Sequence, residues 1–166
     1  MIFRIPSGKH RGRPFRFGIW WRRPVFTWQV TFDQSCRYDL KSVDQGDYNK
    51  LIGIGYLWHH HKDSARFGWR YWPDTGQIEL SAYCYISGRR TIYHIALVEI
   101  GRKCRLQLNV TKLAYVFDVY DLDAGKSAGG CSLLHLHRKR LQYRLGLYFG
   151  GNAVAPNEMS IQLKRI

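Results

Sequence analysis

Arginine, tyrosine and glutamine occupy the polar sides of several segments in which apolar and polar residues alternate. These residues are Gln29, Arg66, Arg70, Tyr83, Tyr85, Arg144 and Tyr148. Guanidinium groups pair with a carboxylate or phosphate through two hydrogen bonds, and phenol rings stack on sugars or bases. The set predicts a surface that binds an extended anionic polymer. The alternative is that the same side chains form cross-strand pairs that stabilise a sheet.

Three consecutive histidines at positions 59–61 have side chains suited to metal binding or proton transfer. Because side chains alternate along a strand, only His59 and His61 would point to the same side. Asp63 is the only carboxylate near them at ligand spacing, so we expect no metal site. We predict that His59 and His61 contact ligand at the rim of the binding surface or move a proton there. An exposed turn is the simpler alternative.

A second pair of histidines, His135 and His137, shares one side of a possible strand. Three basic residues follow at once, Arg138, Lys139 and Arg140. We interpret this basic run as a solvated loop that could extend a positive field toward an anionic partner.

The usual motifs of nucleotide and hydrolytic chemistry are missing from the sequence. Residues 124–127 resemble a fragment of a phosphate-binding loop, but they lack its first glycine and the helix pattern that follows it. Glu79 is the only acid on the predicted binding side, which disfavours glycoside hydrolysis by a pair of carboxylates. We therefore expect no bound cofactor.

Net charge points to an anionic partner. The chain has 26 lysines and arginines against 12 aspartates and glutamates, a formal charge of +14. Such a surplus attracts nucleic acid, an acidic glycan or an anionic surface. Arginine outnumbers lysine, which favours planar recognition of carboxylate or phosphate. A generally basic surface without a specific partner is the remaining interpretation.

The spacing of the cysteines and the length of the apolar runs restrict the class of protein to which the chain can belong. None of the four cysteines forms a C-x-x-C pair, so we expect free and mostly buried thiols rather than a zinc site. Apolar runs such as residues 92–98 are much shorter than the roughly 20 residues of a membrane helix, and we expect no membrane partner. No secretory signal is visible, which predicts a cytoplasmic protein or one whose export signal has been removed. Oligomeric state stays open.

Period-two alternation recurs along the chain, and no three-turn helical stripe interrupts it. It predicts about ten strands, at residues 15–20, 25–32, 50–56, 65–72, 77–86, 91–98, 103–110, 113–120, 142–149 and 158–164. The glycine-rich stretch 121–130 reads as a longer loop. Short strands at this spacing predict an all-β fold, a two-sheet antiparallel sandwich that forms a single domain over residues 1–166.

Four fragments resemble, in the same order, motifs of the concanavalin-A-like jelly-roll polysaccharide lyases, particularly the glucuronan and alginate lyases. Those families have a K-L-P-G-L segment, a strand ending in W-R, an E-L-Y-x-Y strand and an F-F-G-G near the C-terminus. The corresponding stretches are KLIGI at residues 50–54, SARFGWR at 64–70, IELSAY at 78–83 and YFGG at 148–151. The resemblance covers residues 49–166.

This resemblance implies a concave groove that binds a uronate-containing glycan. In such lyases a Tyr or His removes the proton beside the carboxylate, and Arg, Lys or Gln neutralises that carboxylate. The resemblance implies Tyr83 or Tyr85 as the base, with Arg66, Arg70 and Lys50 as neutralising residues. Binding without cleavage is equally compatible with these motifs.

Two other functions fit the same sequence. A nucleic-acid-binding protein of phage or mobile-element origin would use the charge and the aromatic residues, because basic grooves with aromatic platforms also bind single strands. A structural jelly-roll protein, such as a particle component, would leave the charge incidental. The sequence predicts an acidic polysaccharide as the partner, with nucleic acid as the alternative.

Overall fold

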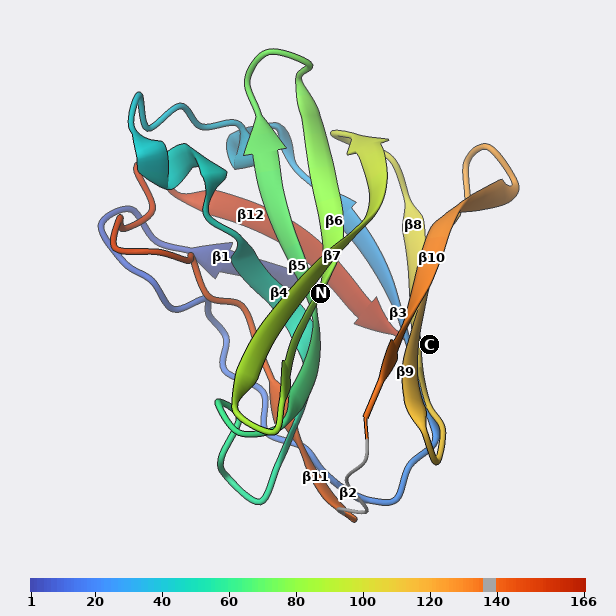
Figure 1. Cartoon of the computed structure of the whole chain (residues 1–166). Coiled ribbons are helices and arrows are strands. Elements are labelled where there is room, and N and C mark those ends of the chain that lie inside the picture. The colour runs from blue at the N-terminus through green and yellow to red at the C-terminus, as the bar shows by residue number, and fades with distance from the viewer. Residues whose placement is uncertain (136–139) are drawn as a thin grey trace.

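Two antiparallel sheets pack face to face in the computed structural model, which describes residues 1–135 and 140–166 (Figure 1). Within these ranges the first sheet has six strands in the order β1, β12, β3, β8, β9, β10, and the second has six in the order β2, β11, β4, β5, β6, β7. This arrangement confirms the predicted all-β sandwich. The strands are β1 (Ile2–Ile5), β2 (Ile19–Trp21), β3 (Val25–Phe32), β4 (Asn49–Tyr56), β5 (Ser64–Trp72), β6 (Gln77–Ile86), β7 (Arg89–Glu99), β8 (Cys104–Val110), β9 (Ala114–Asp121), β10 (Lys126–Leu134), β11 (Leu141–Leu145) and β12 (Met159–Arg165).

Two short 3-10 helices, η1 (Gln34–Cys36) and η2 (Val43–Gly46), lie in the connection from β3 to β4. No helix in the described ranges is long and apolar enough to span a membrane. The four cysteines are free thiols, and all except Cys131 are buried. His137, Arg138 and Lys139 lie outside the described residues, so the interpretations given to them stay predictions, whereas Arg140 is described and exposed.

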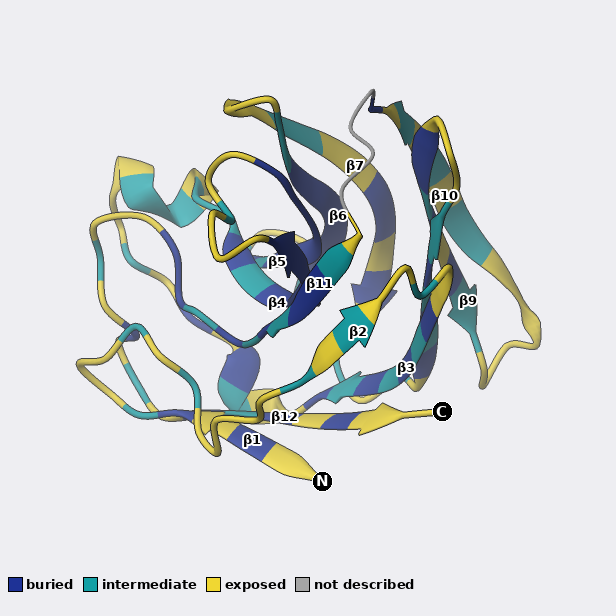
Figure 2. Ribbon diagram, turned by 90° about the horizontal axis from the view of Figure 1, so that it is seen from below, coloured by how far each residue is buried: buried dark blue, intermediate teal, exposed yellow. Residues whose placement is uncertain are grey.

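The core forms where the alternating apolar residues of the two sheets meet. On β3 the residues Phe26, Trp28, Val30 and Phe32 are buried, while the residues between them are partly exposed. From the second sheet, Phe67 packs edge-on against Trp28, with ring centroids 6.3 Å apart, and Trp69 lies 5.3 Å from Phe32. Each aromatic side chain buried in this way stabilises the fold by about 2–3 kcal/mol. Figure 2 shows the same alternation of buried and exposed residues along β12.

The structure differs from the predicted strands near the N-terminus and at β10. β1 has no predicted counterpart, and β2 is shorter than the segment predicted at residues 15–20. β10 forms in a glycine-containing stretch, part of which reads as a loop, because the edge of β9 supplies backbone partners from Asp121 to Ala114. Backbone pairing needs no side-chain alternation, so the sequence pattern gives no signal for such a strand.

One edge of the sandwich is closed by a close approach of β10 to β7, strands of different sheets. A Cβ atom added at Gly129 would overlap the carbonyl oxygen of Ile95, a backbone atom that cannot rotate away. Only a residue without a side chain lets the two strands come this near.

We expect Gly129→Ala to lower the free energy of unfolding by about 1–3 kcal/mol, because the added methyl group forces β10 away from β7. Gly146→Ala is the matched control, since an added Cβ there meets no atom within 4 Å. Denaturant unfolding of both variants is the measurement. Equal stabilities would contradict the proposed closure of this edge.

The outer face of the second sheet, opposite the core, is bent by two irregularities. The register shifts between Lys50 and Ile52 on β4 and between Leu80 and Ser81 on β6. Such bulges bend and twist a strand locally. β7, at the edge next to β6, is strongly bent in Figure 2. The bent face contains most of the side chains that the sequence singles out.

Candidate functional site

Strand register brings Arg66 to the centre of this outer face. Arg66 on β5 lies opposite Gly53 of β4 and Tyr83 of β6, and Tyr143 of β11 lies opposite Gly55 of β4. Cross-strand partners point to the same face of a sheet. A Cβ atom at Gly55 would lie 2.7 Å from the Tyr143 ring, so this glycine lets the tyrosine lie flat across β4 toward Arg66.

Arg66 is only 9% exposed. Its Nη2 donates to the carbonyl oxygen of Gly146 (2.6 Å), whereas its Nε has no hydrogen-bond partner in the described part of the chain. Among the described residues no Asp or Glu forms an ion pair with it. Burial lowers the pKa of Arg66 to about 10, partly opposed by Tyr83, Tyr143 and Tyr85. At neutral pH the group is therefore a buried cation without an anion.

Lys50 adds a second cation beside Arg66. Its Nζ donates to the carbonyl oxygen of Tyr48 (2.9 Å) and lies 4.9 Å from the Tyr83 ring centre and 5.7 Å from that of Tyr148. Burial, together with the charge of Arg66, lowers the pKa of Lys50 to about 8. Tyr148 in turn stacks on His10, with ring centroids 5.1 Å apart. Lys50 therefore joins Tyr83 and Tyr148 on this face, and the ligand-binding role given to Lys50 and Tyr148 stays a prediction.

A polar cavity of about 420 Å³ opens beside Lys50 and Tyr83. Arg90 of β7 contributes a third cation to it, and a hydrogen bond shared with Tyr83 raises the pKa of that guanidinium. Asp47 is the only carboxylate among the described residues that line it. The lining residues are Gly46, Asp47, Tyr48, Lys50, Tyr83, Arg90, Ile92, Gly151 and Asn152.

Tyr83 is a phenol that keeps its proton at neutral pH. The rings of Tyr83 and Tyr85 lie 6.0 Å apart at a steep angle. Burial, and then the hydrogen bond with Tyr85, raises the pKa of Tyr83. A phenol with a raised pKa stays protonated at neutral pH, so it can donate a hydrogen bond or a proton but is not the phenolate that a base needs to be. The geometry therefore favours Tyr83 as a donor, in contrast to the base role that the family resemblance implies.

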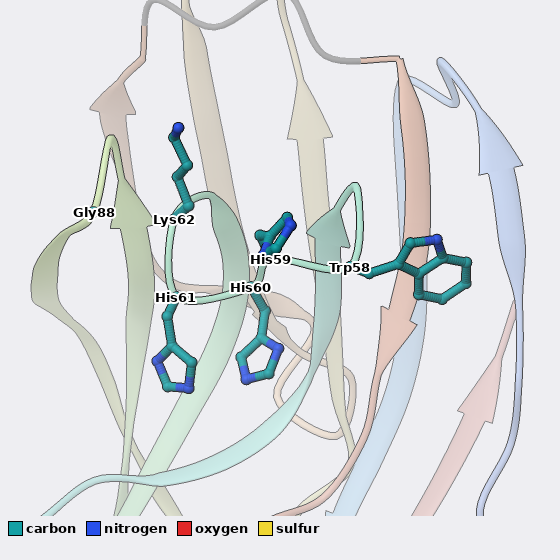
Figure 3. Close-up of a pocket in the computed structure, with 6 residues that line it drawn as sticks. All are labelled: Trp58, His59, His60, His61, Lys62 and Gly88. Atoms are coloured by element: carbon teal, nitrogen blue, oxygen red, sulfur yellow. The ribbon is translucent and has the colours of Figure 1, made fainter.

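The histidine run forms a turn, and the prediction that His59 and His61 share a side is wrong. Leu57 and Trp58 have positive φ angles of 49° and 62°, so the chain reverses between β4 and β5 and strand alternation does not apply. His60 and His61 point the same way, with ring centroids 4.3 Å apart, while His59 points away from them (Figure 3).

His60 and His61 reach the tyrosines of the outer face. The Nδ1 atom of His60 lies 3.2 Å from the hydroxyl of Tyr143, and the ring of His61 lies 5.1 Å from that of Tyr85. Burial, followed by the charges of His61 and Arg66, lowers the pKa of His60, so its imidazole is neutral at neutral pH. No three metal ligands converge anywhere in the described ranges. A second cavity, of about 340 Å³, is lined by residues 58–62 and Gly88 (Figure 3).

We call Arg66, Lys50, Tyr83, Tyr85, Tyr143 and His60 the Arg66 cluster. Sequence reasoning misses Tyr143 because the more apolar side of β11 faces outward, and it misses His60 because the histidines lie in a turn. The glycines of KLIGIG, which leave space above β4, are the only sequence signal for a large side chain there.

Arg70, predicted to neutralise the carboxylate of the substrate, already interacts with neighbouring residues of the protein. Its guanidinium lies between the rings of Tyr48 and Trp72, 4.2 and 4.3 Å from their centres. Its Nε donates to Glu79 (2.8 Å) and its Nη1 to the carbonyl oxygen of Gly46 (2.7 Å). The charge of Arg70 is thus already balanced, and the side chain supports the site rather than binding a further anion.

Glu79 is the acceptor at the centre of this network. Tyr48 and Trp72 each donate to it at 2.6 Å, and Nδ1 of His94 lies 3.2 Å away. Burial alone would raise the pKa of Glu79, but the hydrogen bonds from Tyr48, Arg70 and Trp72 outweigh it and lower the pKa to about 2. The carboxylate is ionised at neutral pH, and Tyr48, Arg70 and Trp72, which donate to it, hold this part of the face together.

Two predicted residues, Gln29 and Arg144, lie away from the cluster. Gln29 is on β3 of the first sheet, opposite Arg105 and Lys164. Arg144 is opposite Ile54, on the side of β11 that faces the other sheet, and its guanidinium lies 5.6 Å from the ring of Phe3. Alternation places both residues on polar sides, but it does not show which sheet or which edge those sides belong to.

We expect Glu79→Gln to reduce the loss of stability in acid. Because folding lowers the pKa of Glu79, its contribution is complete above about pH 4.3 and disappears as the pH falls toward 2. Between pH 6 and pH 2 the wild type should lose on the order of 2–3 kcal/mol more than the variant. Denaturant unfolding across this range measures it, with the exposed Glu99→Gln as control. If the unfolding free energies of wild type and Glu79→Gln fell in parallel with pH, the stabilising role of the hydrogen bonds to Glu79 would be contradicted.

Comparison with known proteins identifies the fold. No protein family model matches the sequence, and no curated protein sequence matches it. Among solved structures, the alginate lyase from Klebsiella pneumoniae matches with a TM-score of 0.61 at 11% identity, over 86% of this chain and 59% of the enzyme. The exolytic PL7 alginate lyase AlyA5 from Zobellia galactanivorans matches with a TM-score of 0.59 at 7% identity, over 99% of this chain and 83% of the enzyme.

A third structure with the same fold has no known function. It is a functionally unknown protein from Saccharomyces cerevisiae, with a TM-score of 0.59 at 11% identity, over 90% of this chain and 73% of that protein. This chain spans about three-fifths of the Klebsiella enzyme. The structural matches establish the jelly-roll fold of alginate lyases, as the sequence motifs predict. Because the sequence identities are so low, function has to be argued from the site.

Proposed function

We propose that this protein binds an acidic, uronate-containing polysaccharide along the outer face of its second sheet, with one sugar carboxylate held by Arg66. The supporting observation is the buried guanidinium of Arg66, whose Nε has no partner in the described residues. Burying an unpaired charge is costly, and a carboxylate is the anion that fits a planar guanidinium.

The surroundings of Arg66 suit a chain of acidic sugars better than a single small anion. Lys50 and Arg90 provide further cations along the same face, beside the cavity next to Tyr83. The phenol rings of Tyr83, Tyr85 and Tyr143 provide surfaces against which sugar rings pack and hydroxyls that bond to them. The alginate lyases with this fold act on a polymer of this class, which supports the proposal by analogy.

We expect Arg66→Met to weaken binding of alginate or glucuronan oligosaccharides about 100-fold or more, because the carboxylate loses its buried cation. In the absence of ligand the variant should be at least as stable as the wild type, since an uncompensated buried charge is removed. Calorimetric titration and denaturant unfolding measure the two effects.

Arg105→Met is the control, because it removes a guanidinium from the first sheet, where Arg105 lies 4.7 Å from the ring centre of Tyr120. Equal losses of affinity in the two variants would indicate a diffuse basic surface. Single-stranded DNA at matched salt is the second arm. Tighter binding of DNA than of uronate oligosaccharides, insensitive to Arg66→Met, would favour the nucleic-acid alternative over this proposal.

The same cluster has the groups needed for cleavage by β-elimination, and we propose that activity as the finer form of the function. Arg66 neutralises the carboxylate, so the neighbouring C5 proton becomes acidic. His60 takes that proton when its Nδ1–H donates to Tyr143 and its Nε2 is free. The electron pair forms the C4–C5 double bond, the C4–O bond breaks, and the leaving oxygen takes a proton from Tyr83. No oxidant, metal or water is consumed.

We expect His60→Gln to lower the rate of unsaturated uronate formation at least about 100-fold while leaving oligosaccharide affinity unchanged. Because folding lowers the pKa of His60, the acidic limb of the wild-type rate profile should lie below pH 6.5. His59→Gln is the control, since that ring points away. Absence of any unsaturated product from the wild type would overturn the elimination and leave the binding proposal in place.

A further inference from the structure

A strip of exposed apolar side chains lies at the edge of the second sheet next to the Arg66 cluster. Phe17, Ile19 and Trp21 are 64%, 45% and 66% exposed, and Trp58 in the neighbouring turn is 53% exposed. We call these four residues the β2 platform. Contiguous exposed apolar side chains often mark a binding surface.

Strand register places the platform on the same face as the Arg66 cluster. Ile19 lies opposite Tyr143, and Trp21 lies opposite Leu141. The ring of Phe17 is stacked on that of Trp58, with centroids 5.9 Å apart and planes within 7°. Trp58 points away from His60 and His61 (Figure 3). Its ring lies 4.7 Å from that of Tyr143. An unbroken series of ring contacts therefore leads from Phe17 to Tyr143, which borders Arg66.

The platform is flanked by positive charge. Residues 9–23 contain six cationic side chains, Lys9, Arg11, Arg13, Arg16, Arg22 and Arg23, and no acidic one. None of the six forms an ion pair within the described part of the chain. The occupant must therefore offer flat apolar surfaces to the rings and negative charge to the arginines beside them. A second copy of this chain does not fit, because its own cationic segment would face this one.

The free backbone edge of β2 distinguishes between the two remaining kinds of ligand, an anionic lipid surface and an acidic sugar chain. β2 is the terminal strand of its sheet, so one row of its N–H and C=O groups has no strand partner in the described residues. Inserting this edge into a lipid bilayer would leave these groups unsatisfied. Sugar hydroxyls, by contrast, donate to and accept from such groups while the apolar face of the ring packs on an aromatic side chain.

We infer that the β2 platform binds additional sugar units of the same acidic polysaccharide, so that the ligand extends from Arg66 across β11 and onto β2. This inference rests on the proposed function and adds a second, aromatic section to the same binding face. Affinity should then increase with chain length, because only longer oligosaccharides reach from Arg66 to Trp21.

The test compares a length series of alginate and glucuronan oligosaccharides on the full chain and on Phe17→Ala/Trp21→Ala. The variant should lose at least about tenfold in affinity for the longest oligosaccharides and nothing for the shortest, which Arg66 holds. Val43→Ala/Leu113→Ala is the matched control, because both residues are exposed apolar side chains outside the platform. It should bind every length as the wild type does.

Three outcomes would overturn the inference. One is unchanged binding of long oligosaccharides by the platform variant, and another is an equal loss at every length. The third is binding of vesicles containing anionic lipid that the platform variant loses while its affinity for long oligosaccharides stays intact. If no oligosaccharide of any length binds the wild type, the proposed function itself fails. If the short ones bind and only the length effect is missing, the inference alone fails.

Discussion

A buried guanidinium without a carboxylate is the constraint on which the proposed site depends. Burial lowers the pKa of Arg66 only to about 10, so the side chain stays charged at neutral pH. The fold tolerates this cost because phenol rings and one backbone carbonyl surround the group and because the aromatic core between the sheets provides ample stabilisation. A site of this kind gains free energy when an anion arrives, because the desolvation of Arg66 has already occurred during folding.

Arg66 and Arg70 show how two arginines of one strand come to have different roles. Both point to the outer face of β5, four residues apart, and both lie among tyrosines. Arg70 has Glu79 beside it on β6, so its charge is balanced within the protein. Opposite Arg66 the same strand has Tyr83, which offers no negative charge at neutral pH. The position of a single carboxylate therefore separates the supporting network from the binding group.

The sequence predicts well those parts of the fold in which one side of a strand is buried and the other is solvated. The alternation from Phe26 to Phe32 and from Cys104 to Val110 matches the buried sides of β3 and β8. It fails where pairing is set by the backbone alone, as in β10, and where the chain turns, as at His59. It also fails on β11, where the more apolar side faces outward, so Tyr143 and Arg144 exchange their expected places. Arg66, Lys50, Tyr83, Tyr85 and Tyr148 are found together because they lie on central strands or bridge to them.

Arg66, which we call the anchor, and the β2 platform differ in solvation, and this difference gives them different roles in the proposed recognition. Arg66 is almost fully buried, so in the proposed complex its interaction with a carboxylate would be strong and dependent on geometry, and this would give selectivity for an acidic sugar. The β2 platform is open to water, so in the inferred complex each stacked ring would contribute modestly and would tolerate variation in the sugar. Tyr143 lies at the boundary, with one side toward Arg66 and the other toward Trp58. A polymer would be positioned by the anchor and retained by the platform, and β11, which separates the two, would determine how many sugar units lie between them.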